Sequence, residues 1–554
     1  MPGRVNMLCG MSDYSGNAIS SHGVKNRDKY WAIPLNVMKK KFRKKVCLML
    51  ASCSLTLWIA SADSREVTIL YTNDIESVYE PIEAHWREDI AFIGGMAHLS
   101  SLIRVERSAR KTSFLVDAGD IFTGSLSKVT EGRLSFDLYS AMGYDAVNLG
   151  NHEFEYGWEV LSHVKQRARF PVLNANIMHE ASDSHFSRQY AVLESDGVKL
   201  GVIGLMGIDA FMNTMMKSNR EGLYAVPPDE IVQRLIDDIR DEVDLLVLLT
   251  HQNKTAPMQT DKEADPMVRR GIDEDFALAG KVRGVDLIVG GHSDHGLEEP
   301  VCHPVTGTCV VMTYGQGMHL GVALFSLQSG KSAELRSASL IPVDSLKYPA
   351  DPGIVDMISK VRLEYPALMD KIAKLDRQAP RKYYRESVIG NLLADALRDY
   401  ANVDIGMMPA GAIRADFASG DLTREAILNV FPFTDRVSVL TIPGDTLRQV
   451  LKKSLSLEYG LVQFSGLSLT YDSRNPIGKR LATVSVAGEP LDKNRQYTLV
   501  TGSFTANGGE NYTMFEGLPV VISDVLVSDA LIQEFGRKGD LYAPNLGRQV
   551  DLAD

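Results

Sequence analysis

The chain has 554 residues, of which 45% are hydrophobic and 23% are charged. These proportions are globular, and the length predicts two domains of roughly 200 to 280 residues each. The formal net charge is −11 at pH 7, but the first 62 residues carry ten Lys and Arg against two Asp, so the remainder carries −19. Such an acidic chain argues against nucleic-acid polymers and anionic membranes as partners.

The N-terminus has the pattern of a secretory signal peptide. Six Lys and Arg within residues 39–45 precede an apolar run over residues 46–59, which ends in Ala60-Ser61-Ala62. The run is too short to span a membrane. Because Met38 stands directly before the basic cluster, we take residues 1–37 as a spurious extension and residues 38–62 as the signal peptide.

A lipoprotein anchor is the alternative interpretation of this leader. Residues 50–53 resemble a lipoprotein-processing site, but apolar residues continue past Cys53, which favours a cleaved protein that is periplasmic or secreted. Removing the leader leaves two cysteines, Cys302 and Cys309. In an oxidising compartment a pair so close in sequence predicts a disulfide, and two unpaired thiols are the less favoured alternative.

Five apolar segments are predicted strands, and each is followed by side chains with oxygen or nitrogen donors. In chain order they are residues 67–71 before Asn73, Asp74 and Glu76; SFLVDAGD with Asp117 and Asp120; YDAVNLGNHEFEYG with Asn151, His152 and Glu155; VDLLVLLTHQN with His251; and VDLIVGGHSDH with His292 and Asp294. Between them lie segments with helical periodicity, such as residues 231–243. Strands alternating with helices predict an α/β fold.

The repeated pattern predicts a shared metal site. A single donor after a strand is more often a turn or capping feature, but ligands in α/β sheets bind at the carboxyl ends of strands, where five such segments can meet. The residues are donors for divalent transition metals. They are too numerous for one ion, and two ions sharing a carboxylate fit better; the set is Asp74, Glu76, Asp120, Asn151, His251, His292 and Asp294.

The motifs carry a family resemblance. TNDIES, DAGDIFTGS, GNHEFEYG, LLTHQN and GGHSDH occur in the order of the five metallophosphoesterase blocks of the 5′-nucleotidase family, which includes secreted nucleotidases and periplasmic UDP-sugar hydrolases. IGNLLADAL, GAIRADF, VFPFTDRV and TANGGENY resemble that family's C-terminal nucleotide-binding domain. The resemblance covers nearly all of residues 66–550.

This resemblance implies the architecture. We expect a four-layer α/β/β/α metallophosphoesterase sandwich over residues 63–345 and a smaller α/β substrate-binding domain over residues 381–554. Residues 346–380 would connect them, with a helix over residues 364–380 that ends at Pro380. The family also carries a disulfide where Cys302 and Cys309 lie.

The resemblance implies a role for each donor. Asp120 would bridge two divalent ions, Asp74, Glu76 and Asp294 would complete one site, and Asn151, His251 and His292 the other. His152 would be the catalytic imidazole, oriented by Glu155. The isolated residues His85, His98 and His163 are assigned to surface or helix packing, and His295 to the wall of the cleft.

Three of these positions depart from the family. Position 76 holds Glu where the family has His, position 294 holds Asp where it has Asn or Gln, and position 155 holds Glu where it has Asp. One metal site would then be entirely carboxylate, which shifts the expected ion from zinc towards manganese, magnesium or iron. The identity of the two ions stays open.

The C-terminal half carries the residues expected to bind a nucleotide. Arg381 and Arg385, four residues apart on a possible helical turn, and Arg414 match phosphate-binding positions of the family. A helix is expected around residues 392–397. From the sequence alone Arg381 would be ordinary surface charge.

Two aromatic residues are expected to enclose the base. Phe433 and Phe504 match the stacking positions of the family, although each alone would more often be a core residue. Glu510 stands where the family has a ribose-binding Asp, Asp435 where it has a base-contacting Asn, and Pro409 where it has another polar residue. These changes leave the nucleoside preference open.

The favoured hypothesis is a secreted, two-metal phosphohydrolase that releases phosphate from nucleoside 5′-monophosphates and acts also on UDP-sugars. The alternatives are a 2′,3′-cyclic nucleotide phosphodiesterase or another phosphoesterase of the same family, and a degenerate nucleotide-binding protein. The last is disfavoured because every replacement at the metal site keeps a donor atom. The sequence leaves the oligomeric state open.

Overall fold

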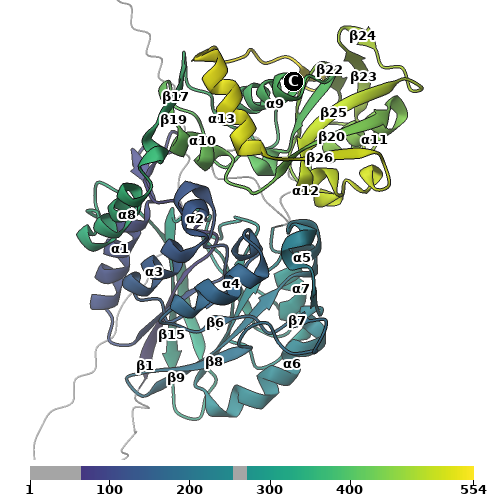
Figure 1. Ribbon diagram of the computed structural model, residues 1–554. Coiled ribbons are helices and arrows are strands. Elements are labelled where there is room, and N and C mark those ends of the chain that lie inside the picture. Colours follow the sequence, from purple (N-terminus) through teal and green to yellow (C-terminus); the bar gives the residue numbers. More distant parts are fainter. Residues whose placement is uncertain (1–63, 254–270) are drawn as a thin grey trace, which may run out of the picture. The chain divides into compact units, whose positions relative to one another are not determined.

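The structure is a computed structural model that describes residues 64–253 and 271–554 (Figure 1). The predicted extension, signal peptide and alternative anchor at Cys53 lie outside the described residues. The chain from Ser61 to Asp554 forms one unit by its internal contacts. Among the described residues, no helix combines the length and the hydropathy that a membrane crossing requires.

Two six-stranded sheets form the N-terminal half. The first has the order β16 (Glu334–Pro342), β15 (His319–Leu327), β1 (Arg65–Thr72), β4 (Ser113–Asp117), β5 (Ala146–Asn148) and β6 (Val172–Leu173). The second has the order β13 (Val301–Cys302), β14 (Cys309–Val311), β12 (Leu287–Gly291), β11 (Leu245–His251), β9 (Val198–Met206) and β8 (Tyr190–Ser195). All five strands predicted to end in donors are present. Strands β1, β4 and β5 are parallel to one another, as are β11 and β12, so their carboxyl ends meet at one edge of each sheet.

The central strands are buried on both faces because their sequences are continuously apolar. In β11, Leu245, Val247 and Leu249 pack against the other sheet, while Leu246 and Leu248 pack against helices. Each such side chain contributes about 1.5–3 kcal/mol when it is fully buried. The alternation makes one apolar layer between the sheets and one outside each of them.

Helices cover the outer faces of both sheets. Helices α6 (Pro228–Ile239) and α7 (Asp273–Lys281) pack on the second sheet. Helices α1 (Met96–Ser108) and α3 (Arg133–Met142) pack on the first. The four-layer α/β/β/α sandwich is therefore confirmed.

The C-terminal half is a smaller α/β domain, as predicted. Its central sheet has the order β21 (Gln463–Ser465), β18 (Ile405–Met408), β25 (Gln496–Gly502), β20 (Arg436–Pro443) and β26 (Val520–Leu526). Helices α9 (Val388–Ala401) and α13 (Val527–Lys538) cover one face, and α11 (Gly444–Ser454) covers the other (Figure 1). The expected helix around residues 392–397 is part of α9.

The helix expected over residues 364–380 is wrong. Helix α8 (Pro352–Glu364) ends where that prediction begins, and residues Lys371–Leu375 form strand β17. Pro366 explains the end of α8, because a proline disfavours helical backbone in the residue before it. The segment KIAKL then buries Ala373 and Leu375 and exposes Lys374 between them, which is the two-residue alternation of a strand.

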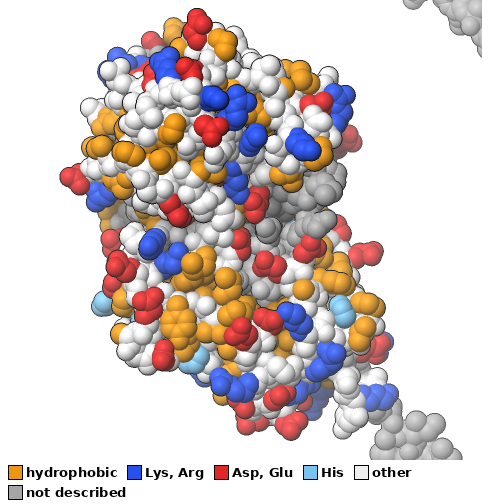
Figure 2. Space-filling view, turned by 90° about the vertical axis from the view of Figure 1, so that its right-hand side faces the viewer, with side chains coloured by type: hydrophobic (Ala, Val, Ile, Leu, Met, Phe, Trp, Pro, Cys, Tyr) orange, Lys and Arg blue, Asp and Glu red, His pale blue; other side chains and the backbone are white. Residues whose placement is uncertain are grey.

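The predicted disulfide between Cys302 and Cys309 is present. The two residues are paired across the antiparallel strands β13 and β14, so the bond closes a hairpin at the edge of the second sheet. On the face of the molecule seen in Figure 2, Asp and Glu side chains are interspersed with Lys and Arg.

Candidate functional site

The donors at the ends of the five strands converge between the two sheets. The Oδ2 atom of Asp120 lies 3.0 Å from Nε2 of His251, and Oδ1 of Asn151 lies 3.1 Å from the same nitrogen. Asp120, His251 and His292 offer ligand atoms that all lie within 4.8 Å of one another, a spacing suited to a metal ion. The juxtaposition expected from the sequence is therefore found in the fold.

Two further carboxylates adjoin this group. Both carboxylate oxygens of Asp74 accept a hydrogen bond from the backbone N–H of His292, at 2.9 Å. Oδ1 of Asp294 is buried and has no hydrogen-bond partner among the described residues. A buried oxygen without a donor is costly unless a cation or another ligand supplies one.

The backbone of the site is strained. Asp74, Glu76 and Asp120 have φ values of 51°, 51° and 59°, and His292 and Asp294 have 74° and 54°. Non-glycine residues adopt this left-handed region at a cost of about 1–3 kcal/mol each, and such residues cluster at functional sites. The strain turns the side chains at the strand ends towards one another.

The electrostatics show a site that is short of positive charge. Burial and the neighbouring Asp294 raise the pKa of Asp74 well above its usual value, and burial and Asp120 raise that of Asp294 to about 7. Burial opposes ionisation of Asp120 also, but the imidazoles of His251 and His152 hold its pKa below the usual range. Divalent cations would relieve this repulsion, so the residues present fit a metal centre.

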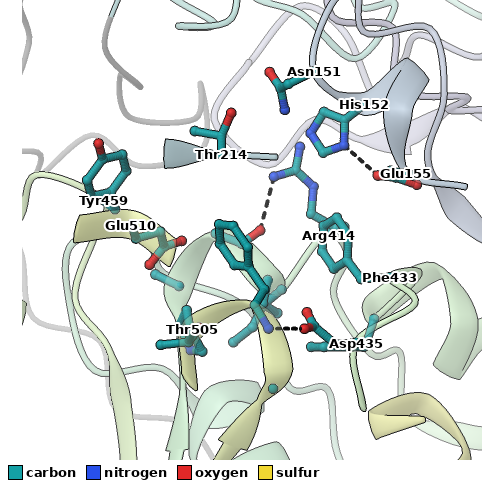
Figure 3. Close-up of a pocket in the computed structure, with 18 of the residues that line it drawn as sticks. Asn151, His152, Glu155, Thr214, Arg414, Phe433, Asp435, Tyr459, Thr505 and Glu510 are labelled. Carbon is teal, nitrogen blue, oxygen red and sulfur yellow. Dashed lines mark hydrogen bonds and ion pairs between the residues drawn. The ribbon is translucent and has the colours of Figure 1, made fainter. Parts of the chain in front are cut away.

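His152 lies beside the carboxylates with its ring held by Glu155. Its Nδ1 atom is 2.5 Å from Oε1 of Glu155 (Figure 3). The same oxygen accepts a hydrogen bond from Oγ1 of Thr123 at 3.1 Å. Burial opposes the charged form, yet the charges of Asp120 and Glu155 raise the pKa of His152 to about 10. The Nε2 atom is directed towards Glu76 and Asp120, at 3.5 Å and 3.7 Å. The longer Glu155 therefore reaches the imidazole.

The sequence prediction missed Glu153. This buried carboxylate accepts four backbone N–H groups, from Asp120, Ile121, Phe122 and Gly150, at 2.5–3.2 Å. It joins the turn after β4 to the turn after β5 and so fixes Asp120 and Asn151 relative to each other. Its place between Asn151 and Glu155 in GNHEFEYG was the available signal, but nothing local indicates partners some thirty residues away.

The metal group opens into one cavity that both halves of the chain line. The predicted site residues in its wall are Glu76, Asp120, Asn151, His152, Glu155, His292, Asp294, Arg381, Arg414, Phe433, Asp435, Phe504 and Glu510. Asp74 and His251 are buried next to these residues. In Figure 3, Asn151 and His152 face Tyr459 and Glu510 across the cavity, with Arg414 between them. No local pattern in the sequence pointed to Tyr459, Thr214 or Met215, which also line it.

The three predicted phosphate-binding arginines are not equivalent. Arg414 forms an ion pair with Glu76, and its carbonyl accepts a hydrogen bond from Nη1 of Arg381 at 2.6 Å. Arg385 is absent from the wall formed by the described residues and donates to Asp554 at 2.6 Å. The expected helical turn through Arg381 and Arg385 is wrong, because α9 begins only at Val388, after its N-cap Ser387.

The two predicted aromatic residues lie in the same cavity. The ring of Phe433 is 5.9 Å from that of His152, with 27° between the planes. Oδ1 of Asp435 accepts a hydrogen bond from the backbone N–H of Phe504 at 2.6 Å, so this carboxylate holds the second aromatic residue. Glu510 is buried, its Oε2 atom has no described partner, and burial raises its pKa to about 8.

The isolated histidines lie outside the cavity wall. Nδ1 of His98 is 2.7 Å from the carbonyl oxygen of Tyr348, and Nδ1 of His163 is 2.8 Å from that of Glu159 in its own helix. His85 is exposed beside Glu83. His295 packs beside Gly271 instead of lining the cavity formed by the described residues.

Two family models match the chain. Residues 67–295 match that of calcineurin-like phosphoesterases, and residues 369–517 match that of the 5′-nucleotidase C-terminal domain.

Relatives match over most of their length. Protein UshA of Yersinia enterocolitica is 26% identical over 85% of this chain and 91% of its own. The 5′-nucleotidases of Vibrio vulnificus and Homo sapiens are 27% and 28% identical, over 92% and 84% of this chain and 98% and 87% of their own. Among solved structures, a 5′-nucleotidase precursor from Thermus thermophilus has a TM-score of 0.77 at 24% identity and covers 88% of this chain and 100% of its own, which shows the same fold.

The role of Glu153 can be tested with Glu153→Gln. An amide puts an NH₂ group where one oxygen accepts backbone N–H groups, so we expect the affinity for divalent metal to fall about 10- to 100-fold, as with other residues that orient ligands. Metal content after dialysis against a graded chelator measures this. Glu159→Gln, on the exposed face of helix α4 (Trp158–Val164), is the matched control. Equal metal retention in both variants would contradict the assignment.

Proposed function

The chain belongs to the 5′-nucleotidase family and is a metal-dependent phosphoric ester hydrolase, and we propose that it releases inorganic phosphate from nucleoside 5′-monophosphates. One observation carries the proposal. A single cavity combines the candidate metal ligands and His152 with Arg414 and the aromatic pair Phe433 and Phe504. A phosphate group next to a base meets both kinds of partner in such a cavity.

We propose that two divalent cations bind at the strand ends. Asp120 would be shared, Asp74, Glu76 and Asp294 would hold one ion, and Asn151, His251 and His292 the other. When bound, such ions polarise phosphoryl oxygens and lower the pKa of water. The carboxylate set at the first position favours manganese, magnesium or iron over zinc.

The arginines and His152 act on the phosphate in this proposal. The guanidinium group of Arg414 presents paired donors that suit phosphate oxygens, and Arg381 supports it through the carbonyl of Arg414. The substrate phosphate would replace Glu76 as the partner of Arg414. His152, protonated below its pKa of about 10, donates from Nε2 to a phosphoryl oxygen or to the leaving oxygen. Glu155 keeps Nδ1 occupied and so fixes the ring.

The opposite end of the cavity would hold the nucleoside. Phe433 and Phe504 offer stacking faces, which suit every base. Glu510 presents a carboxyl oxygen that has no hydrogen-bond partner among the described residues and suits a sugar hydroxyl. Cleavage of UDP-sugars uses the same parts. Hydrolysis of 2′,3′-cyclic nucleotides is the alternative reaction at this site, and Arg385 stays a predicted phosphate contact with no support from the cavity wall.

We place this activity outside the cytoplasm. The signal peptide expected over residues 38–62 leads to this location, and the disulfide between Cys302 and Cys309 supports it, because such bonds persist in oxidising compartments. In this proposal residues 63–345 are the catalytic domain, residues 346–380 the connection and residues 381–554 the nucleotide-binding domain.

The central test is phosphate release from AMP by the metal-loaded protein and by His152→Ala. We expect the variant to keep its metal and to lose about 10²- to 10⁴-fold in kcat, because proton donation is removed while the predicted ligands remain. His163→Ala, in the exposed part of helix α4, should behave as wild type.

A substrate panel separates the alternatives. Wild-type protein that retains metal but leaves AMP, UDP-glucose and 2′,3′-cyclic AMP intact would defeat the nucleotidase assignment and spare the fold. Turnover of the cyclic nucleotide alone would establish the diesterase alternative.

The metal preference can be tested with Glu76→His. Imidazole is a softer ligand than carboxylate, so we expect the ratio of zinc to manganese affinity to rise by at least about tenfold. Competitive metal binding followed by elemental analysis gives the ratio without relying on activity. An unchanged ratio would show that Glu76 serves Arg414 and binds no cation.

Glu510 predicts a pH-dependent affinity for nucleotides. Its pKa is raised to about 8 by burial, so the neutral carboxyl, which donates a hydrogen bond, persists up to that pH and is lost above it. We expect the KM for AMP to rise as the pH passes from below to above pH 8 and to lose this dependence in Glu510→Gln. Glu516→Gln, an exposed neighbour, is the control. Identical profiles for the wild type and Glu510→Gln would refute the role of Glu510.

A further inference from the structure

Lys128 is a half-buried lysine that the proposed function does not use. It lies in helix α2 (Gly124–Thr130) of the metallophosphoesterase domain. Its Nζ atom donates to the carbonyl oxygen of Phe433 at 2.7 Å and to Oγ of Ser528 at 3.0 Å, both in the C-terminal domain. No carboxylate of the described residues lies within ion-pairing distance of it. Burial lowers its pKa to about 8.

A buried ammonium group that contacts only two neutral acceptors recovers little of its desolvation free energy, so it is an unfavourable contact between two domains. Desolvating a charge is costly, and a carboxylate partner would offset more of that cost than a carbonyl and a hydroxyl. Asp529, Glu155 and Asp435 are near enough to favour the charged form without pairing with it. What the lysine provides is a strong, directed hydrogen bond to the backbone of Phe433.

The segment that Lys128 holds connects both halves of the cavity. Residues 433–435 follow one another, and each contacts a different part of the site. The ring of Phe433 stacks on His152, the Thr434 hydroxyl donates to the carbonyl oxygen of Glu155 at 3.3 Å, and Asp435 accepts from the N–H of Phe504. A shift of this segment would move both stacking rings relative to the catalytic imidazole.

We propose that Lys128 is a positioning residue that fixes Phe433 beside His152 and thereby gives the enzyme its selectivity for phosphate esters that carry a base. This inference rests on the proposed function and names the residue that links its two parts. Lys128 need not touch the substrate. It acts through the backbone carbonyl of Phe433.

The test compares AMP with p-nitrophenyl phosphate, which has no nucleobase. In Lys128→Met we expect the KM for AMP and the inhibition constant of adenosine to rise together by about ten- to hundredfold, the range for one lost hydrogen bond to a charged group. The kcat for AMP should stay within about twofold, and kcat/KM for p-nitrophenyl phosphate should not change. Lys128→Gln keeps an N–H donor without the charge and should restore most of the affinity for adenosine.

The matched control is Lys165→Met. Lys165 also donates to a backbone carbonyl, that of Phe186 at 2.7 Å, and burial likewise lowers its pKa to about 8. It does not line the cavity. Its loss should lower stability and leave the ratio between the two substrates unchanged.

The possible outcomes distinguish a positioning role of Lys128 from a direct effect of its positive charge on the phosphate. An equal loss for AMP and p-nitrophenyl phosphate would show that Lys128 supplies positive potential to the phosphate, and unchanged constants would show that it is structural; either result overturns the proposal. Should Lys128→Met not fold, Ser528→Ala removes the second acceptor and must shift the adenosine constant in the same direction, or the proposal fails. Calorimetric titration of AMP distinguishes failure of this inference from failure of the proposed function. If the wild type binds AMP without hydrolysing it, the nucleotidase assignment is refuted. The affinities of the wild type and of Lys128→Met for AMP still show whether Lys128 sets the affinity.

Discussion

The constraint on which the rest of the structure depends is the burial of several carboxylates at one edge of two sheets. Asp74, Asp120 and Asp294 lie almost without solvent, and burial raises the pKa of Asp74 and Asp294. Like charges so confined repel unless cations lie among them. The fold holds them there by three means: apolar strands that place the residues, left-handed backbone that turns them inward, and Glu153, which ties two of the turns together. Each of these three features keeps the carboxylates from moving apart when no metal is bound.

Two links of different kinds join this metal site to the C-terminal domain. Arg414 forms an ion pair with Glu76, whereas the ammonium group of Lys128 donates a hydrogen bond to the neutral carbonyl group of Phe433. In the proposed function the first link lies where a phosphate would bind, so Arg414 is paired with Glu76 until an anion replaces that carboxylate. The second is made to the backbone carbonyl of Phe433, and Lys128 does not belong to the cavity wall formed by the described residues, so we expect no ligand to displace it. In the proposed function, the partner of Arg414 at the phosphate end is therefore exchangeable, whereas Phe433 at the base end keeps its contact with Lys128.

The sequence predicted what local patterns record. The strands at residues 245–251 and 287–291 are apolar and pass directly into donors, so the α/β class and the metal group followed from such strands, whereas the four layers followed from the family resemblance. Contacts between distant residues leave no such record, which is why Glu153 and Lys128 were missed. Spacing alone was misleading where the backbone was not the assumed one: Arg381 and Arg385 lie in a loop, and the expected helix from residue 364 contains Pro366 and a strand. Strand and helix patterns predict neither the limits of the domains nor the identity of the metal.

The replacement of the family's His by Glu76 ties metal binding to phosphate binding in the proposed function. A neutral imidazole would leave Arg414 without a partner at this place, whereas the carboxylate of Glu76 pairs with it. The carboxylate oxygen that ligates a cation is less available to the guanidinium group, so cation binding at Glu76 weakens its hold on Arg414 and favours phosphate there. Coupling of this kind is reciprocal, because two ligands that favour the same arrangement strengthen each other's binding by equal factors. In the proposed function, Glu76 thus pairs with Arg414 while the cavity is empty, and metal and phosphate would stabilise each other's binding when it is occupied.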